Sequence, residues 1–223
     1  MRTPRKRRGR KVQMRQKLLE EHKKTLKFSV MQKNVLIGLL LGDGHIELAP
    51  NKKSARLKVE YSVKNSDYVE FLYQLFKNLV RMQPRTRSVK GFGRNFDRVG
   101  FTTLSLPEFL LFRNLFYKNK TKIVPLNIEK LLTNIGLAVW FMDDGSYKSR
   151  ECRGKLLCTH NFSNEEIVIL CQVLKNKFDL DAIPRRQKDG TEIYIRASSY
   201  ERLKTIISPF IVKSFQYKIG QFS

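Results

Sequence analysis

The chain has 223 residues, with 44 Lys or Arg against 20 Asp or Glu, so its formal net charge is +24 at pH 7. Hydrophobic residues make up 41% and include 15 Phe and 8 Tyr, which supports a real core and excludes a wholly disordered basic protein. Three cysteines do not form a disulfide framework, and the apolar runs are too short to cross a bilayer. We therefore expect a soluble intracellular protein that binds a polyanion and has no membrane partner.

The N-terminal segment, residues 1–28, is a basic arm. Residues 1–27 hold twelve Lys or Arg and two acids, yet the other 196 residues still carry a net charge of +14, so the body is basic as well. The arm has no hydrophobic face before Leu18, and we expect it to be disordered or weakly helical when free. It would bind phosphates of the polyanion beyond the surface that the folded body contacts. Its composition also resembles an organellar transit segment, which is an alternative.

Two apolar runs that end in Asp-Gly, LIGLLLGDG at 36–44 and LAVWFMDDG at 137–145, place Asp43 and Asp144 101 positions apart. The pattern Ser29-x-x-Gln32 predicts a capping box at the start of a helix of about 14 residues. This helix contains the first apolar run and should be buried on all sides. We expect glycine to end each helix in a left-handed cap. If the two helices pack side by side across a pseudo-twofold axis, their acids meet, and a divalent cation would relieve the repulsion.

The repeat continues beyond these runs. Residues 56–63 alternate between apolar and polar, which is typical of a half-exposed strand, and residues 155–162 align with them at an offset of 99. Amphipathic helices are predicted at 68–79 and 167–178, followed by basic strands, a longer loop at 91–97 in the first copy, return strands and a last helix. The chain is therefore predicted to be α+β, with two αββαββα halves at 29–125 and 126–223.

Polar residues that face away from the predicted core are candidates for contacts with the expected polyanion, and their types could read base edges if it is a nucleic acid. The alternative is an ordinary solvated face. In the second copy the same alignment turns Cys158 and His160 toward the core, so we expect no zinc site from them and Cys152. The candidates are Arg56, Lys58, Glu60, Ser62, Arg85, Arg87, Arg98 and Thr102 in the first copy and Lys155, Thr159, Asn161, Arg185 or Arg186, Lys188, Tyr194 and Arg196 in the second.

On these motifs and their spacing, the chain from Ser29 to Ser223 resembles a double-motif LAGLIDADG homing endonuclease of the WFMDDG branch. The resemblance implies antiparallel β-saddles over double-stranded DNA, and a monomer that makes a staggered double-strand break at a long target site. It also implies that Asp43 and Asp144 bind Mg²⁺, with Mn²⁺ as a substitute. Lys122 and Lys218, 96 positions apart, would act near the scissile phosphates, while Asp143 would point elsewhere.

The sequence departs from the family pattern at Leu41-Gly42 and at Val139-Trp140, where we expect a looser helix contact. Two other functions stay open at this point. One is an RNA maturase that assists splicing of its own intron, alone or beside nuclease activity. The other is a non-catalytic DNA-binding regulator. An intron-encoded protein of this kind would act in a chloroplast or mitochondrion.

Overall fold

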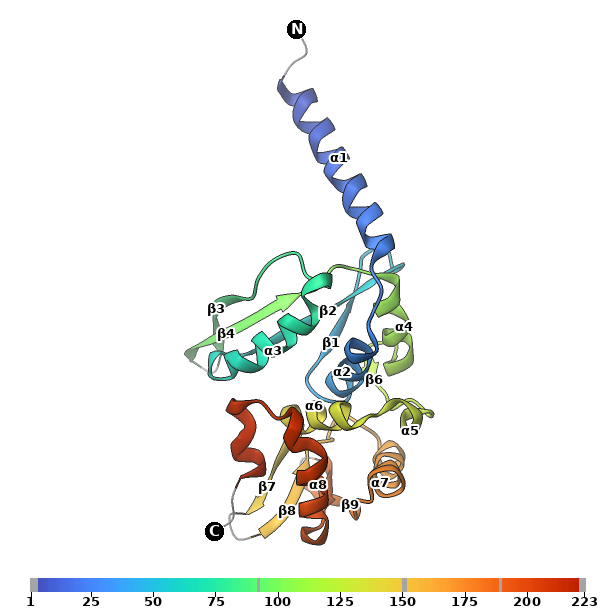
Figure 1. The fold of residues 1–223 in the computed structure, drawn as a ribbon, viewed down its shortest axis with the longest axis vertical. Helices are drawn as coiled ribbons and strands as arrows, with labels where there is room; N and C mark the ends of the chain where they lie inside the picture. Colours follow the sequence, from blue (N-terminus) through green and yellow to red (C-terminus); the bar gives the residue numbers. More distant parts are fainter. Residues whose placement is uncertain (1–3, 92, 150–151, 189, 221–223) are drawn as a thin grey trace.

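The computed structural model describes residues 4–91, 93–149, 152–188 and 190–220, which form two similar halves stacked along the long axis (Figure 1). Each half has the predicted order of helix, hairpin, helix, hairpin and helix, so the α+β prediction is confirmed. The first half contains α2 (Val30–Leu41), β1 (His45–Leu48), β2 (Ala55–Ser62), α3 (Ser66–Phe76), β3 (Arg85–Gly91), β4 (Arg94–Thr102) and α4 (Pro107–Phe116). The second contains α6 (Asn134–Asp144), β7 (Gly145–Ser149), β8 (Cys152–Leu157), α7 (Asn164–Phe178), β9 (Ala182–Gln187), β10 (Gly190–Ile195) and α8 (Tyr200–Ile207).

The two sheets have the same topology. Their strand orders are β1-β2-β4-β3 and β7-β8-β10-β9, and all neighbouring strands are antiparallel. The strands β3 and β4 pair as far as Gly91 and Arg94, so the longer loop expected at 91–97 is wrong. Between the sheets lie α2 and α6, which contact each other at the centre of the molecule (Figure 1).

The central helix pair is packed tightly at small residues. A Cβ on Gly38 would lie 2.3 Å from the carbonyl oxygen of Gly136 and 2.8 Å from Cβ of Val139. The expectation of a looser contact is therefore wrong, because Val139 fills the space that Gly38 leaves. The capping box of Ser29 and Gln32 is confirmed.

The glycines that follow the two motifs do not form left-handed caps, so that expectation is wrong. Gly145 has φ −70°, and Gly44 is not among the described glycines with positive φ, which are Gly93 and Gly190; the residue that caps α2 is Gly42, with φ −94°. Glycine is needed there for close approach, since a Cβ on Gly44 would lie 2.6 Å from the carbonyl oxygen of Leu39, and one on Gly145 would lie 2.4 Å from that of Phe141.

The predicted alternation holds in β2, where residues 55, 57, 59 and 61 are buried and residues 56, 58 and 62 are exposed. In the second half the predicted faces are wrong: Lys155 and Thr159 are buried, with 0% and 1% exposure, whereas Cys158 and His160 are exposed. Lys155 pairs with Ile195 of β10, which places it on the helix-covered face. The strand phase differs by one residue from the alignment, and a one-residue slip exchanges the two faces.

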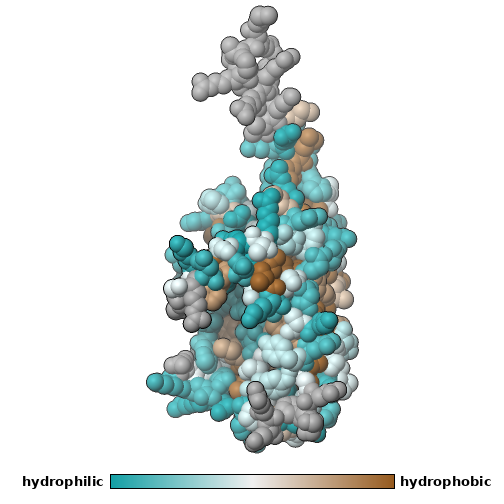
Figure 2. All heavy atoms as spheres, turned by 90° about the vertical axis from the view of Figure 1, so that its left-hand side faces the viewer, coloured by the Kyte–Doolittle hydropathy of each residue, from teal (hydrophilic) through white to brown (hydrophobic). Residues whose placement is uncertain are grey.

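The basic arm forms α1 (Pro4–Thr25), a helix of 22 residues that projects from one end of the body (Figures 1 and 2). This differs from the expectation of disorder or weak helicity. Its described side chains from residue 13 on are mostly exposed. No helix among the described residues is both long and apolar enough to span a bilayer. The remaining elements are β5 (Tyr117–Lys118), β6 (Thr121–Lys122), α5 (Ile128–Leu131) and the 3₁₀ segments η1 (Val63–Asn65), η2 (Lys77–Leu79), η3 (Ala197–Ser199), η4 (Ser208–Phe210) and η5 (Lys213–Ile219).

Candidate active site and nucleic-acid interface

The two motif aspartates lie where the central helices end. Asp43 follows α2 and is exposed, and Asp144 is the last residue of α6 and is partly buried. Because α2 and α6 run side by side, both carboxylates reach the same central region between the sheets. Helix C-termini carry partial negative charge, so an acid at this position is electrostatically costly.

The neighbouring Asp143 links the two halves. Its Oδ2 accepts a hydrogen bond from the backbone amide of Asp43 at 3.0 Å, and its Oδ1 accepts from the hydroxyls of Tyr61 at 2.9 Å and Tyr68 at 3.1 Å. Burial and the charges of Asp43 and Asp144 raise the pKa of Asp143 well above its usual value. The sequence offered no signal for these two tyrosines, because their hydroxyls lie on otherwise apolar faces.

Two lysines cap the same helix ends. Lys122 of β6 donates to the carbonyl oxygen of Gly42, and Lys218 of η5 donates to those of Met142 at 2.5 Å and Asp143 at 3.1 Å. Lys218 is buried, with 7% exposure, and Lys122 is half-buried. Burial lowers the pKa of both ammonium groups, and the nearby aspartates partly oppose this. These two lysines, 96 positions apart in the sequence, occupy equivalent positions in the two halves.

Negative charge is crowded at this site. Burial and the carboxylate of Asp43 raise the pKa of Asp144 to about 7, against the lowering effect of Lys122 and Lys218. Oxygen ligands suit a hard divalent cation such as Mg²⁺, which usually keeps several waters. Among the described residues no three Asp, Glu, His or Cys side chains gather into a closed metal site. Asp43 and Asp144 therefore fit an open site, in which water and phosphate oxygens complete the ligand set.

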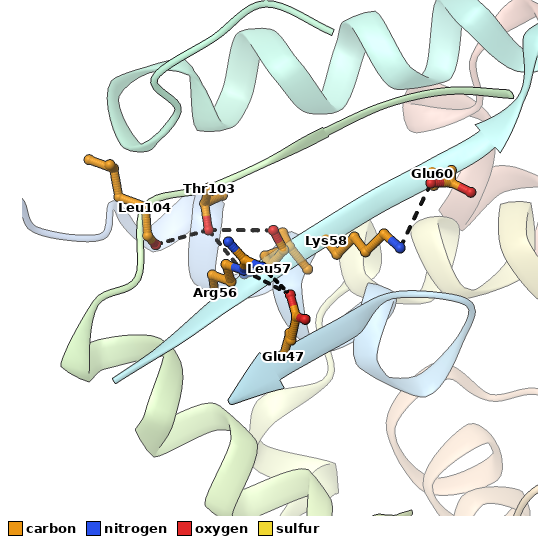
Figure 3. A network of polar contacts seen from close by, with 7 residues as sticks. All are labelled: Glu47, Arg56, Leu57, Lys58, Glu60, Thr103 and Leu104. Atoms are coloured by element: carbon orange, nitrogen blue, oxygen red, sulfur yellow. Dashed lines mark hydrogen bonds and ion pairs between the residues drawn. The ribbon is translucent and has the colours of Figure 1, made fainter. Parts of the chain in front are cut away.

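The first sheet presents a charged open face. Glu60 on β2 forms ion pairs with Lys58 at 3.9 Å, with Arg98 at 3.8 Å and with Arg87. Figure 3 shows Lys58 beside Glu60, and Arg56 turned toward Glu47 of β1, which it contacts at 2.7 Å. Strand register places all eight candidates of the first copy on this face: Arg56, Lys58, Glu60, Ser62, Arg85, Arg87, Arg98 and Thr102.

The second sheet brings fewer candidates together. Arg185 pairs with Glu192 and lies on the same open face as Tyr194, whereas Arg186 pairs with Thr191 on the face of the buried Ile193. The other exposed candidates lie off the strands: Asn161 is in a turn, Lys188 follows β9, and Arg196 follows β10 and contacts Asp181 at 3.1 Å.

The side of the molecule that carries the β3–β4 hairpin and η5 is mostly hydrophilic in both halves (Figure 2).

Residues 33–203 match the model of the LAGLIDADG DNA endonuclease family. The chain belongs to that family. Family membership agrees with the paired helix ends and the two equivalent sheets described above.

Two known proteins resemble this chain over most of its length. The "Probable intron-encoded endonuclease 1" of Wickerhamomyces canadensis is 30% identical over 210 residues, which cover 91% of this chain and 90% of the relative. The "Cytochrome b mRNA maturase bI2" of Saccharomyces cerevisiae is 28% identical over 202 residues, which cover 85% of this chain. The match spans about half (47%) of that maturase.

Among solved structures, the homing endonuclease I-WcaI bound to its DNA recognition sequence superimposes with a TM-score of 0.85. The identity is 28%, and the match covers 92% of both chains. The fold is therefore that of a LAGLIDADG homing endonuclease over almost the whole chain.

Proposed function

We propose that this protein is a sequence-specific DNA endonuclease that hydrolyses one phosphodiester on each strand at a long target site. The observation that carries the proposal is the position of Asp43 and Asp144 at the ends of the two packed motif helices, whose last carbonyls are each capped by a lysine. Structural similarity to an endonuclease solved on its DNA supports the assignment.

Asp43 and Asp144 would hold divalent cations, with Mg²⁺ as the physiological ion and Mn²⁺ as a substitute. When bound, the ions supply Lewis-acid activation of water and stabilise the leaving oxygen. The ammonium groups of Lys122 and Lys218 would place positive charge near the two scissile phosphates, where negative charge develops.

Double-stranded DNA would lie across the open faces of both sheets, so each half, 29–125 and 126–223, would read one half of the target. Arg87, Arg98 and Arg185 are residue types that donate to guanine edges in the major groove. The helix α1 would add phosphate contacts beyond the sheets, since it carries most of the charge of the arm. A monomer supplies both halves, so no second copy is needed to cut both strands.

The test is cleavage of a plasmid that carries the uninterrupted host-gene site, with and without Mg²⁺. Asp43→Asn or Asp144→Asn should abolish double-strand cleavage while target binding remains measurable. The exposed Asp97→Asn, on β4 far along the hairpin, is the control for loss of one carboxylate. Full cleavage by either motif variant contradicts the proposal.

A second candidate function is that of an RNA maturase for the protein's own intron. The similarity to the yeast cytochrome b mRNA maturase favours it, over about half of that protein. Binding of the intron RNA and splicing of a precursor transcript, measured for the wild type and Asp144→Asn, would separate the two roles. An intron-encoded protein of either kind would act in an organelle such as a mitochondrion.

A further inference from the structure

We propose that each active-site lysine is positioned by a carboxylate from the opposite half of the molecule, so that Glu166 controls Lys122 and Asp67 controls Lys218. This inference rests on the proposed nuclease function. It adds two positioning residues and assigns each of them to one of the two strand cleavages.

The first of the two contacts, here called anchors, is made by Glu166. It joins α7 of the second half to the segment that follows β6 of the first half. Oε1 of Glu166 accepts the backbone amide of Val124 at 2.8 Å. Val124 is buried, with 5% exposure, and lies two residues after Lys122. Oε2 of Glu166 accepts the amide of Ser163 at 2.8 Å in a capping box, so the carboxylate is fixed at both oxygens.

The second anchor has the same form with the halves exchanged. Oδ2 of Asp67, in the first turn of α3, accepts the backbone amide of Ser214 at 2.8 Å, and Oδ1 accepts the amide of Tyr68 at 2.9 Å. Ser214 belongs to η5, four residues before Lys218. In Figure 1, η5 lies beneath α3, and the segment between β6 and α5 lies above α7.

Ring packing extends the second anchor to the ammonium group itself. Tyr68 packs edge-on against Phe215 with ring centroids 5.2 Å apart, and Nζ of Lys218 lies 4.9 Å from the Phe215 ring centre. Asp67, the adjacent Tyr68, Phe215 and Lys218 therefore form a continuous path from the first half into the second. Small displacements of a catalytic group have large effects on rate, because the reacting geometry is narrow.

The two carboxylates are also equivalent in the sequence repeat, whereas their amide donors lie two residues after Lys122 and four residues before Lys218. Asp67 and Glu166 are 99 positions apart, which is the offset of the aligned strands before them, and both lie in the first turn of the helix that follows the first hairpin. Each carboxylate reaches across the central interface to a main-chain amide. Such a contact does not depend on which side chain the donor residue carries. The shared position of the two acids, each bound to the lysine-bearing segment of the other half, indicates that the two contacts serve the same purpose.

The experiment is single-turnover cleavage of a target duplex whose two strands carry different labels. Lys122→Met and Lys218→Met first identify the strand that each lysine serves. Glu166→Gln should then slow the Lys122 strand roughly tenfold, and Asp67→Asn the Lys218 strand by a similar factor, with the other strand within about twofold and target affinity unchanged. The exposed neighbours Glu165→Gln and Glu70→Gln remove the same charge from the same helices and should leave both rates unchanged.

A general loss of structure would slow both strands together, so strand selectivity distinguishes positioning from stability. Ser214→Pro removes the amide donor instead of the carboxylate acceptor, near the start of the 3₁₀ segment η5, and should slow the same strand as Asp67→Asn. The proposal is overturned if Glu166→Gln slows the Lys218 strand, both strands equally or neither strand.

Amide hydrogen exchange separates this inference from the proposed function. Exchange at Val124 should rise in Glu166→Gln, and exchange at Ser214 should rise in Asp67→Asn, whether or not DNA is cut. A wild-type protein that leaves both strands intact overturns the nuclease assignment, and the exchange measurement then decides alone whether the two carboxylates hold these segments.

Discussion

The backbone amide of Asp43 donates a hydrogen bond to Oδ2 of Asp143 at 3.0 Å, so the end of one motif helix is fixed by the other motif. The second carboxylate oxygen is held by Tyr61 and Tyr68, which both come from the first half. Asp143 thus joins the main chain of one metal-binding candidate, Asp43, to the residue directly before the other, Asp144.

Removing either tyrosine hydroxyl should destabilise the protein. Tyr61→Phe and Tyr68→Phe each remove one donor from the half-buried carboxyl of Asp143, which costs about 1–3 kcal/mol. The effect should appear as a lower midpoint in urea unfolding with an unchanged slope. Tyr217→Phe, at a residue that is 60% exposed, is the control. Unchanged stability in both core variants would show that the hydroxyls do not hold Asp143.

A methyl group at Gly38 should destabilise the central helix pair. Gly38→Ala would place Cβ 2.3 Å from the carbonyl oxygen of Gly136, which forces the two backbones apart. Overpacking of this kind costs about 1–3 kcal/mol and lowers the melting temperature. Gly91→Ala is the matched control, since its Cβ would meet only Phe96 at 3.7 Å. A melting temperature equal to that of the control contradicts the close helix contact.

The sequence predicted the first half more accurately than the second, and the reason lies in particular residues. In β2 eight residues alternate strictly, so the phase of the strand was explicit. In the second half the phase was carried over by alignment, although Gly154, Lys155, Leu156 and Leu157 are all buried and β8 ends at Leu157. Lys155 is held over the rings of Tyr147 and Tyr200, at 4.0 and 4.9 Å from their centres, and no local pattern predicts such a lysine.

At the site, the paired motifs predicted Asp43 and Asp144, and the family resemblance implied the two lysines, which stand at matching ends of the repeat. The carboxylates of Asp67 and Glu166 were not predicted as functional, because acids in the first turn of a helix are common and stabilise the helix locally. Their partners lie 147 and 42 positions away, so only the three-dimensional arrangement identifies the contact. The repeat offset of 99 is the one signal that could have marked them.

The buried lysine of the second sheet should make stability depend on pH. Burial lowers the pKa of Lys155 to about 8 from an ordinary value of 10.5. The unfolded state therefore binds more protons between these two values, and stability should rise as pH increases from about 8 to 10.5. Lys155→Met should remove about 1–3 kcal/mol of this rise. Urea unfolding at pH 7, 8, 9 and 10 measures it.

The exposed Lys148→Met is the control for the pH experiment, because it removes a cation from the neighbouring strand without a burial effect. Its stability should follow that of the wild type over the same pH range. A profile for Lys155→Met that is parallel to the wild type would show that the buried ammonium does not cause the rise.

Removal of α1 should weaken DNA binding through charge alone. A chain that begins after residue 25 loses most of the twelve basic residues of the arm, and each lost phosphate contact reduces the salt slope of the binding constant by about 0.9. Binding to the target between 50 and 200 mM salt should show a smaller slope, with the same cleaved sequence. An equal slope with and without α1 would place the arm outside the DNA interface.

The placement of α2 and α6 at the centre has a consequence for building hybrid proteins. Each of these helices belongs to one half and packs against the helix of the other half. Exchanging one half for that of a related chain therefore also replaces one side of the shared core. A viable hybrid must keep the small residues at the helix crossing together with Asp67 and Glu166, the two acids that reach across the interface. Recombination at residues 118–126 should therefore succeed between relatives that share these few positions, whatever bases their sheets recognise.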